Sequence, residues 1–253
     1  MDHNYVNTLR EAYGKANARL IFLDYDGTLI PFANLPEHAV MNGKAEKIIT
    51  SLTNDHKNKV VIISGRGREF LECQFKKPNI TLIAEHGFFI KEFKKGWIAN
   101  AAMELTWKQE AISILKYFTD KCNGAFMEEK FASLAWHYRN VEPDLAKENL
   151  AELKKALHEF LRNNAGLQIL EGKKVLEIKG TLYNKGTVAS RLLKKSHFDF
   201  VMAVGDDKTD EDLFKALPHH AFTIKIGINQ SAARFKLRKQ EQLYDLFLEL
   251  FPA

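Results

Sequence analysis

The sequence has few cysteines and no long apolar segment, and both absences narrow the classes of protein it can belong to. Its two cysteines, Cys73 and Cys122, lie far apart and show no spacing typical of a metal site. They indicate free thiols in a reducing compartment. No apolar stretch reaches the roughly 18 residues that a membrane-spanning helix needs, and the polar N-terminal residues lack the apolar core of a signal peptide. We therefore expect a cytoplasmic protein with no membrane partner.

A concentrated positive charge is also missing. Lysines and arginines number 37 against 32 aspartates and glutamates, which gives a formal net charge of +5. Because the lysines are scattered and form no basic stripe, we expect no nucleic-acid partner. The small excess favours attraction of an anionic small molecule. With 253 residues and 45% hydrophobic content, the chain can form one large or two modest domains.

One stretch near the N-terminus joins an apolar run to two closely spaced acids. Residues 20–23 predict a strand buried on both faces, and Asp24 and Asp26 follow at its carboxyl end, where open α/β sheets bind ligands. Two buried carboxylates require a cation, a proton or both. Gly27 allows a sharp turn, and Thr28 offers a hydroxyl and an amide to an anion. Taken alone, the stretch is equally compatible with a simple acidic turn.

Alternating strand and helix patterns indicate a parallel sheet with helical crossovers. Apolar runs predict strands over residues 20–23, 59–63, 80–84, 198–204 and 221–227. Helices are expected over residues 5–17, 36–57, 67–75, 185–195, 210–216 and 239–250. The fold class is therefore α/β, with a Rossmann-like core.

A block of different character interrupts this pattern. Helices are expected over residues 104–121 and 144–163, with strands within 125–139 and a hairpin over 167–178. The order suggests a duplicated unit of one helix and two strands. We predict an α/β core over 1–103 and 181–253, and an inserted α+β cap over 104–180.

Further acids follow another buried strand. Asp206 and Asp207 end the run over 198–204, and Asp210 lies one turn into the next helix. If this strand neighbours the first, four or five carboxylates converge, and an all-oxygen set favours Mg²⁺. Ser64 ends a third strand and Lys185 begins a helix, so a hydroxyl and an ammonium can join them around a phosphate.

These residue types suit transfer of a phosphoryl group. We assign Asp24 as nucleophile and Asp26 as general acid and base, acting on the leaving oxygen and then on water. Each group also has an ordinary interpretation. Asp206 and Asp207 fit a solvated turn before a helix capped by Asp210, Ser64 fits a helix cap, and Lys185 fits an exposed lysine.

Together these motifs resemble those of the haloacid dehalogenase (HAD) superfamily of phosphatases. The resemblance is carried by Asp24-Tyr-Asp26-Gly27-Thr28, Ser64, Lys185 and Gly205-Asp206-Asp207-Lys-Thr-Asp210. It implies a cap of the type called C2 and a Mg²⁺ ion held by Asp24, the main-chain carbonyl of Asp26, and Asp206. Asp207 and Asp210 are further candidates, as ligands or as groups that orient a ligand.

A closer resemblance is to the trehalose-6-phosphate phosphatases. It rests on Ile63-Ser-Gly-Arg66, Ala84-Glu-His-Gly87, Glu128-x-Lys130, His137-Tyr-Arg139, Gly172-Lys173-Lys-Val-Leu-Glu177-Ile-Lys179 and Lys185-Gly186. It implies substrate contacts from the cap by Glu128, Lys130, His137, Arg139, Lys173 and Glu177. In the core, Thr28, Arg66, Glu85 and His86 are candidate substrate contacts.

The expected function is Mg²⁺-dependent hydrolysis of trehalose 6-phosphate, a step of trehalose biosynthesis, through an aspartyl-phosphate, with a trehalose-6-phosphate synthase as a candidate partner. One alternative keeps the chemistry and changes the ester, for example to sucrose 6-phosphate or a glycosylated phosphoglycerate. Another is a non-catalytic sugar-phosphate-binding partner of a glycosyltransferase, which a degenerate Asp24 or Lys185 would have favoured.

Overall fold

A computed structural model of the chain describes residues 3–76, 79–100 and 104–251. It separates into two compact units, Met1–Asn100 with Asn184–Ala253, and Ala101–Tyr183. Residues 101–103, beside the predicted boundary at 103/104, lie outside the described residues. No helix among the described residues is long and apolar enough to cross a membrane.

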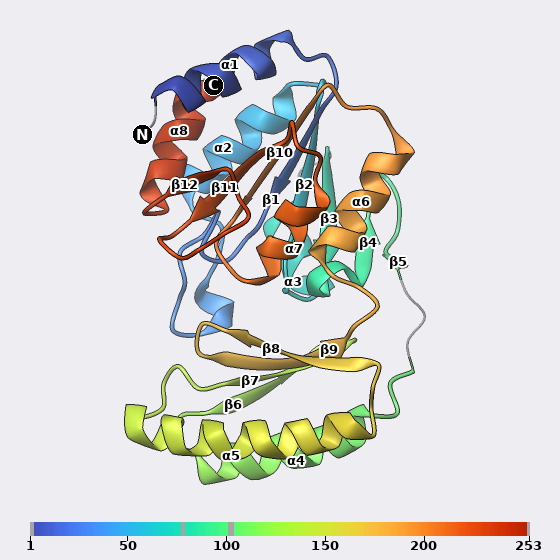
Figure 1. The fold of residues 1–253 in the computed structure, drawn as a ribbon, viewed down its shortest axis with the longest axis vertical. Helices are drawn as coiled ribbons and strands as arrows, with labels where there is room; N and C mark the ends of the chain where they lie inside the picture. Colours follow the sequence, from blue (N-terminus) through green and yellow to red (C-terminus); the bar gives the residue numbers. More distant parts are fainter. Residues whose placement is uncertain (1–2, 77–78, 101–103, 252–253) are drawn as a thin grey trace. The chain divides into compact units, whose positions relative to one another are not determined.

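The first unit is built on an eight-stranded sheet (Figure 1). In spatial order its strands are β12 (Phe235–Leu237), β11 (Phe222–Ile226), β10 (Phe200–Gly205), β1 (Arg19–Leu23), β2 (Asn58–Ile63), β3 (Ile80–Ala84), β4 (Phe89–Lys91) and β5 (Ile98–Ala99). The six strands from β12 to β3 are parallel, and β4 and β5 continue the sheet in antiparallel pairing. The predicted parallel α/β sheet is confirmed, whereas β4, β5 and β12 were not predicted.

Strand β1 lies at the centre of this sheet, and all five of its residues are buried. One sheet face packs against α6 and α7, whose residues Val188, Leu192 and Leu213 join Leu20 and Phe22 in one core cluster (Figure 1). A strand covered on both faces reads as a continuous apolar run, which is why β1 could be found from the sequence.

The helices of this unit are α1 (His3–Lys15), α2 (Gly43–Asn54), α3 (Arg68–Gln74), α6 (Lys185–Lys195), α7 (Thr209–Ala216) and α8 (Glu241–Leu250). The prediction of one helix over 36–57 was wrong at its start. Pro36–His38 forms a separate 3₁₀ turn, η1, and α2 begins only at Gly43 because the Asn42 side chain accepts hydrogen bonds from the amides of Lys44 and Ala45.

The second unit is a four-stranded antiparallel sheet with two helices (Figure 1). Its elements along the chain are α4 (Lys108–Lys121), β6 (Phe126–Glu129), β7 (Ser133–His137), α5 (Pro143–Arg162), β8 (Leu167–Gly172) and β9 (Val175–Gly180). The expected repeat of one helix and two strands is present, with the spatial order β6-β7-β9-β8.

Alternation along the strands of the second unit divides apolar from polar side chains. Leu134, Trp136, Leu176 and Ile178 are buried in a core shared with both helices. Ser133, Ala135 and His137 alternate with them and therefore lie on the opposite face. Cys122 is buried in the same core, and both cysteines are free thiols.

Candidate active site

Strand register brings the first acid beside the loop that carries the others. Leu23 is aligned with Val204 of β10 and with Ile62 of β2, and the Asp24 amide donates to the carbonyl of Val204 at 3.0 Å. The carboxyl ends of the three strands are therefore level. Asp24, only 5% exposed, follows β1 there, next to the segment that begins at Gly205.

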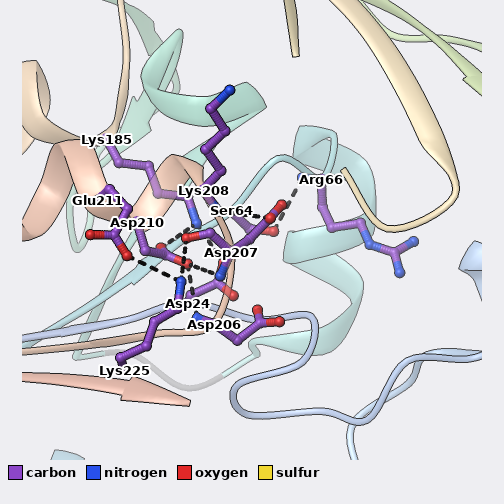
Figure 2. A network of polar contacts seen from close by, with 10 residues as sticks. All are labelled: Asp24, Ser64, Arg66, Lys185, Asp206, Asp207, Lys208, Asp210, Glu211 and Lys225. Carbon is purple, nitrogen blue, oxygen red and sulfur yellow. Dashed lines mark hydrogen bonds and ion pairs between the residues drawn. The ribbon is translucent and has the colours of Figure 1, made fainter. Parts of the chain in front are cut away.

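A buried lysine joins Asp24 to the acid of the next helix. Lys185 Nζ donates to Asp24 Oδ1 at 2.6 Å and to Asp210 Oδ1 at 2.8 Å (Figure 2). Lys185 is the first residue of α6, which is fixed by a reciprocal capping box between Asn184 and Thr187. The cap sets the start of the helix, and thereby the point from which the lysine reaches the two carboxylates.

The second oxygen of Asp210 organises the loop between β10 and α7. Asp210 Oδ2 accepts hydrogen bonds from the amides of Asp206 and Asp207, both at 3.0 Å (Figure 2). Gly205 is needed here, because a Cβ built on it would lie 2.2 Å from the Asp210 carboxyl carbon. Asp210 thus fixes the main chain of the loop. The carboxylate of Asp207 makes a local contact and accepts from the Lys208 amide at 2.7 Å.

Three buried carboxylates form a compact oxygen cluster. One oxygen each of Asp24, Asp206 and Asp210 lie within 4.8 Å of one another. Gly27, with φ of 78°, lets the chain pass close by, since a Cβ there would lie 2.4 Å from Asp206 Oδ2. Oxygen donors at this spacing suit a hard divalent cation such as Mg²⁺. The residues present therefore fit the ion expected from the sequence.

Three buried carboxylates lie together in this cluster, and the Lys185 ammonium binds two of them, Asp24 and Asp210. Burial, followed by the charges of Asp210 and Asp206, raises the pKa of Asp24 well above its usual value, against the lowering effect of Lys185. Burial lowers the pKa of Lys185, but Asp210 and Asp24 outweigh it, so this pKa is raised. The raised pKa means that the lysine stays charged beside the two carboxylates.

Asp26, the proposed acid and base, is held by an arginine. Arg66 donates from Nε and Nη2 to the two carboxylate oxygens of Asp26 at 2.7 and 2.6 Å. Its Nη1 donates to the Pro36 carbonyl at 2.8 Å, and its guanidinium carbon lies 4.4 Å from the centre of the Phe70 ring. Arg66 was predicted to contact substrate. In this structure it binds Asp26.

The loop after β2 packs against the turn after β3. Ser64 is buried, and its hydroxyl accepts from the Arg66 amide at 3.2 Å. The amides of Glu85 and His86 donate to the carbonyls of Arg66 and Ser64, both at 2.9 Å. Glu85 and His86 have positive φ of 49° and 57°, and His86 fills the space beside Gly65. The backbone therefore brings these four predicted site residues together.

Thr28, the candidate contact for an anion, lies in the turn that follows Asp26. It is fully buried, and its carbonyl accepts from Gln240 Nε2 at 2.8 Å. Among the described residues, its hydroxyl has no hydrogen-bond partner. Ser64 and Lys185 are almost as deeply buried as Thr28, and the contact of Thr28 with substrate stays a prediction.

The predicted contacts of the cap lie on the polar face of its own sheet. Lys130 Nζ and Ser133 Oγ both donate to Glu177 Oε1, at 3.0 and 2.6 Å, and all three are largely buried. Glu128 and Glu177 lie on either side of Ala135 in the strand register. Acidic and basic side chains of the second unit are therefore gathered on one face of its sheet, around Ala135 of β7.

A second pair on this face involves the histidine. Nε2 of His137 lies 2.8 Å from Glu128 Oε2, and the ring stacks on Phe126 with centroids 4.5 Å apart. Burial raises the pKa of Glu128, but His137 and Lys130 more than offset this, so the pKa is lowered. Arg139 Nη2 donates to the Lys173 carbonyl at 2.7 Å. All six predicted residues of the cap therefore fall on or beside these strands.

Two residues that contact predicted site residues were not among the candidates from the sequence. Lys225 is 4% exposed and contacts Asp207 and Glu211 (Figure 2). The signal that could have found Lys225 was a lysine inside an otherwise apolar strand, Phe222-Thr-Ile-Lys-Ile. Ser133, the hydroxyl partner of Glu177, had no distinguishing pattern.

Comparison with known proteins matches residues 22–246 to the family model described as trehalose-phosphatase. The chain is 38% identical over 252 residues to a bifunctional trehalose-6-phosphate synthase/phosphatase of Thermoproteus tenax, covering all of this chain and 34% of that protein. It is 36% identical over 254 residues to a trehalose-phosphatase of Schizosaccharomyces pombe, covering 94% of this chain and 31% of the relative. The chain thus spans about a third of the length of these relatives.

A solved structure agrees over nearly the whole chain. The C-terminal domain of a C. albicans trehalose-6-phosphate phosphatase is 30% identical, has a TM-score of 0.92 and covers 97% of this chain and 96% of that one. The α/β fold is that of the HAD-like hydrolases.

Proposed function

Because this chain belongs to the trehalose-phosphatase family, we propose that it hydrolyses trehalose 6-phosphate to trehalose and phosphate. The observation that carries the proposal is the buried cluster of Asp24, Asp206 and Asp210, with Lys185 bonded to two of its members. Nucleophilic attack on phosphorus requires such an activated, buried carboxylate, whereas binding of a sugar phosphate alone does not.

We also propose that the cluster binds Mg²⁺. Asp24 and Asp206 would hold the ion through their carboxylates, and Asp26 through its main-chain carbonyl, with Asp207 beside them. Asp210, whose oxygens already bond Lys185 and two amides, acts by orienting the loop. When bound, the ion would offset the negative charge on the phosphoryl oxygens.

The side chains supply the steps of the reaction. The Asp24 carboxylate attacks phosphorus, the bond from phosphorus to the sugar oxygen breaks, and an aspartyl-phosphate forms. Asp26 gives a proton to the departing sugar oxygen. It then takes a proton from the water that attacks the aspartyl-phosphate, which releases phosphate and restores Asp24. Lys185 and Ser64 would bind and orient the phosphoryl oxygens.

We propose that the predicted contacts in the cap and those in the core both recognise the sugar. In the cap, Glu128, Lys130, His137, Arg139, Lys173 and Glu177 offer carboxylate acceptors and cationic donors that suit hydroxyl groups. In the core, Glu85 and His86 remain candidates. Arg66 would act indirectly, through its contact with Asp26. Thr28 stays a candidate contact for the phosphate, through its hydroxyl or its amide.

The partner proposal rests on the relatives. One of them is described as both a synthase and a phosphatase, so we propose that this chain works together with a trehalose-6-phosphate synthase. Co-purification of the two proteins, with a synthase from the same source, would test this. The cytoplasmic location stays a prediction from the cysteines.

The substrate is tested by phosphate release across a panel of esters, with Mg²⁺ and with EDTA. We expect the highest kcat/KM for trehalose 6-phosphate, no turnover in EDTA, and loss of turnover in Asp24→Asn. A much higher kcat/KM for sucrose 6-phosphate or a glycosylated phosphoglycerate would keep the chemistry and replace the substrate. Turnover that survives Asp24→Asn would overturn the assignment of the nucleophile.

A further inference from the structure

Lys225 is a buried lysine in an otherwise largely apolar strand, β11. It lies near the carboxyl end of β11, is 4% exposed, and is aligned directly with Gly205 of β10. Gly205 is the residue before Asp206, so the lysine side chain starts level with the acidic loop. Burying an ammonium group is costly unless charged or strongly polar partners receive it.

The partners of Lys225 tie three separate segments together. Its Nζ donates to the main-chain carbonyl of Asp207 at 2.9 Å and to Glu211 Oε1 at 3.2 Å (Figure 2). The other oxygen of Glu211 accepts from the Ala232 amide at 2.7 Å. The loop after β10, the first turn of α7 and the segment after β11 are thereby connected through the pair of Lys225, which is buried, and Glu211, which is partly buried.

The acidic loop is consequently held from two sides. Asp210 Oδ2 receives the amides of Asp206 and Asp207 on one side, and Lys225 binds the carbonyl of Asp207 on the other. The peptide groups on both sides of Asp207 are therefore fixed. Since Asp206 directly precedes this point, the direction of its carboxylate depends on the same restraints.

We propose that Lys225, braced by Glu211, is a positioning residue that holds the Asp206–Asp210 loop in the form that binds the metal ion. This inference rests on one part of the proposed function, the binding of a divalent cation at Asp24 and Asp206. Lys225 acts through the main chain of Asp207 and has no role toward the phosphoryl group. Its loss should weaken metal binding, with less effect on recognition of the sugar.

The test is calorimetric titration of the full chain with Mg²⁺ alone, without substrate. In Lys225→Met we expect the dissociation constant for Mg²⁺ to rise by at least about tenfold, the scale seen when groups that orient metal ligands are removed. The control is Lys236→Met, because Lys236 is exposed and aligned with Lys225 on the neighbouring strand β12. This control removes the same charge and should leave the dissociation constant unchanged.

A kinetic readout separates positioning from a general loss of stability. In Lys225→Met the Mg²⁺ concentration for half-maximal phosphate release should rise about tenfold, with KM for the sugar phosphate nearly unchanged and kcat largely recovered at saturating Mg²⁺. A purely structural role would lower the melting temperature and leave the Mg²⁺ dissociation constant as in the wild type, and that result would overturn the proposal.

Two milder variants decide the matter if Lys225→Met does not fold. Lys225→Gln keeps a donor toward Asp207, and Glu211→Gln keeps the acceptor for Ala232 while removing the charge pair. Each should weaken Mg²⁺ binding by a smaller factor, and wild-type affinity in both would contradict the inference. If the wild type binds Mg²⁺ but hydrolyses no trehalose 6-phosphate, the proposed function fails while the titrations still test Lys225.

Discussion

Arg66 binds both carboxylate oxygens of Asp26, through Nε at 2.7 Å and Nη2 at 2.6 Å. A planar guanidinium can make such a paired contact and an ammonium cannot. The remaining nitrogen, Nη1, donates to the Pro36 carbonyl, so the arginine is itself fixed to the segment after β1. The geometry indicates that Arg66 sets the orientation of the acid and base.

We therefore expect Arg66→Lys to lower kcat by roughly 10- to 100-fold, which corresponds to the loss of about 1.5–3 kcal/mol from one charge-assisted hydrogen bond. KM for the sugar phosphate should change little, because the guanidinium is occupied by Asp26. Steady-state kinetics would show this, with Arg238→Lys, an exposed arginine, as the control. A large rise in KM with unchanged kcat would instead support direct substrate binding by Arg66.

The burial of Asp24 among other acids predicts how the stability of the protein depends on pH in EDTA. The pKa of Asp24 is raised by burial and by Asp210 and Asp206. A carboxyl group whose folded pKa lies above its unfolded value stabilises the protein fully below the unfolded pKa, and this contribution is lost as the pH rises through the folded pKa. The metal-free wild type should therefore lose stability as the pH is raised through that range.

Asp24→Asn removes this titration and should flatten the dependence. At pH 7 in EDTA we expect the variant to be more stable than the wild type, because it removes a buried carboxyl group whose charged form is disfavoured in the folded protein. Urea unfolding at several pH values measures both effects. In Mg²⁺ the order should reverse, because the ion stabilises only the protein that binds it. An equally steep pH dependence in both proteins would contradict the assignment.

The Glu128–His137 pair predicts the opposite pH behaviour. The pKa of Glu128 is lowered because His137 and Lys130 outweigh burial. Its contribution to stability is therefore present above the unfolded pKa and is lost as the pH falls through the folded pKa. Glu128→Gln should lower the melting temperature at pH 7, and the difference from the wild type should shrink as the solution is acidified below about pH 4.5.

The neighbouring Glu129 provides the control for this measurement. Its side chain is 52% exposed and pairs with Lys108 at 2.6 Å. An exposed pair contributes at most about 1 kcal/mol, so Glu129→Gln should change the melting temperature little. If the two substitutions lower the melting temperature equally at pH 7, the contact between Glu128 and His137 contributes no more to stability than the exposed pair.

The sequence predicted those parts of the fold and site that depend on local pattern. Strand β1 is apolar from Leu20 to Leu23, and the pairs Asp24 and Asp26, and Asp206 and Asp207, stand at strand ends. Strand β4 could not be found in the same way, because it has three residues and is defined by its antiparallel partner β3. Long-range pairing of this kind leaves no period in a short segment.

Contacts between side chains that are far apart in the sequence could not be predicted from it for the same reason. Arg66 and Asp26 are 40 residues apart, and nothing in either motif shows that the arginine bonds the acid and not a ligand. Lys225 lies 18 residues from Asp207, in a strand whose sequence indicates no partner for its lysine. The motifs identified the residues expected to react or to bind the metal ion. The residues that orient these groups were found only in the structure.

The central claim, that Asp24 carries the phosphoryl group, is tested most directly by acid-quenching the enzyme during turnover of trehalose 6-phosphate in Mg²⁺ and mapping phosphate on its peptides. The account predicts that up to one phosphate per chain appears on the peptide that contains Asp24, and that it disappears when substrate is exhausted. Rapid turnover with phosphate on no peptide, or on a peptide without Asp24, would contradict it.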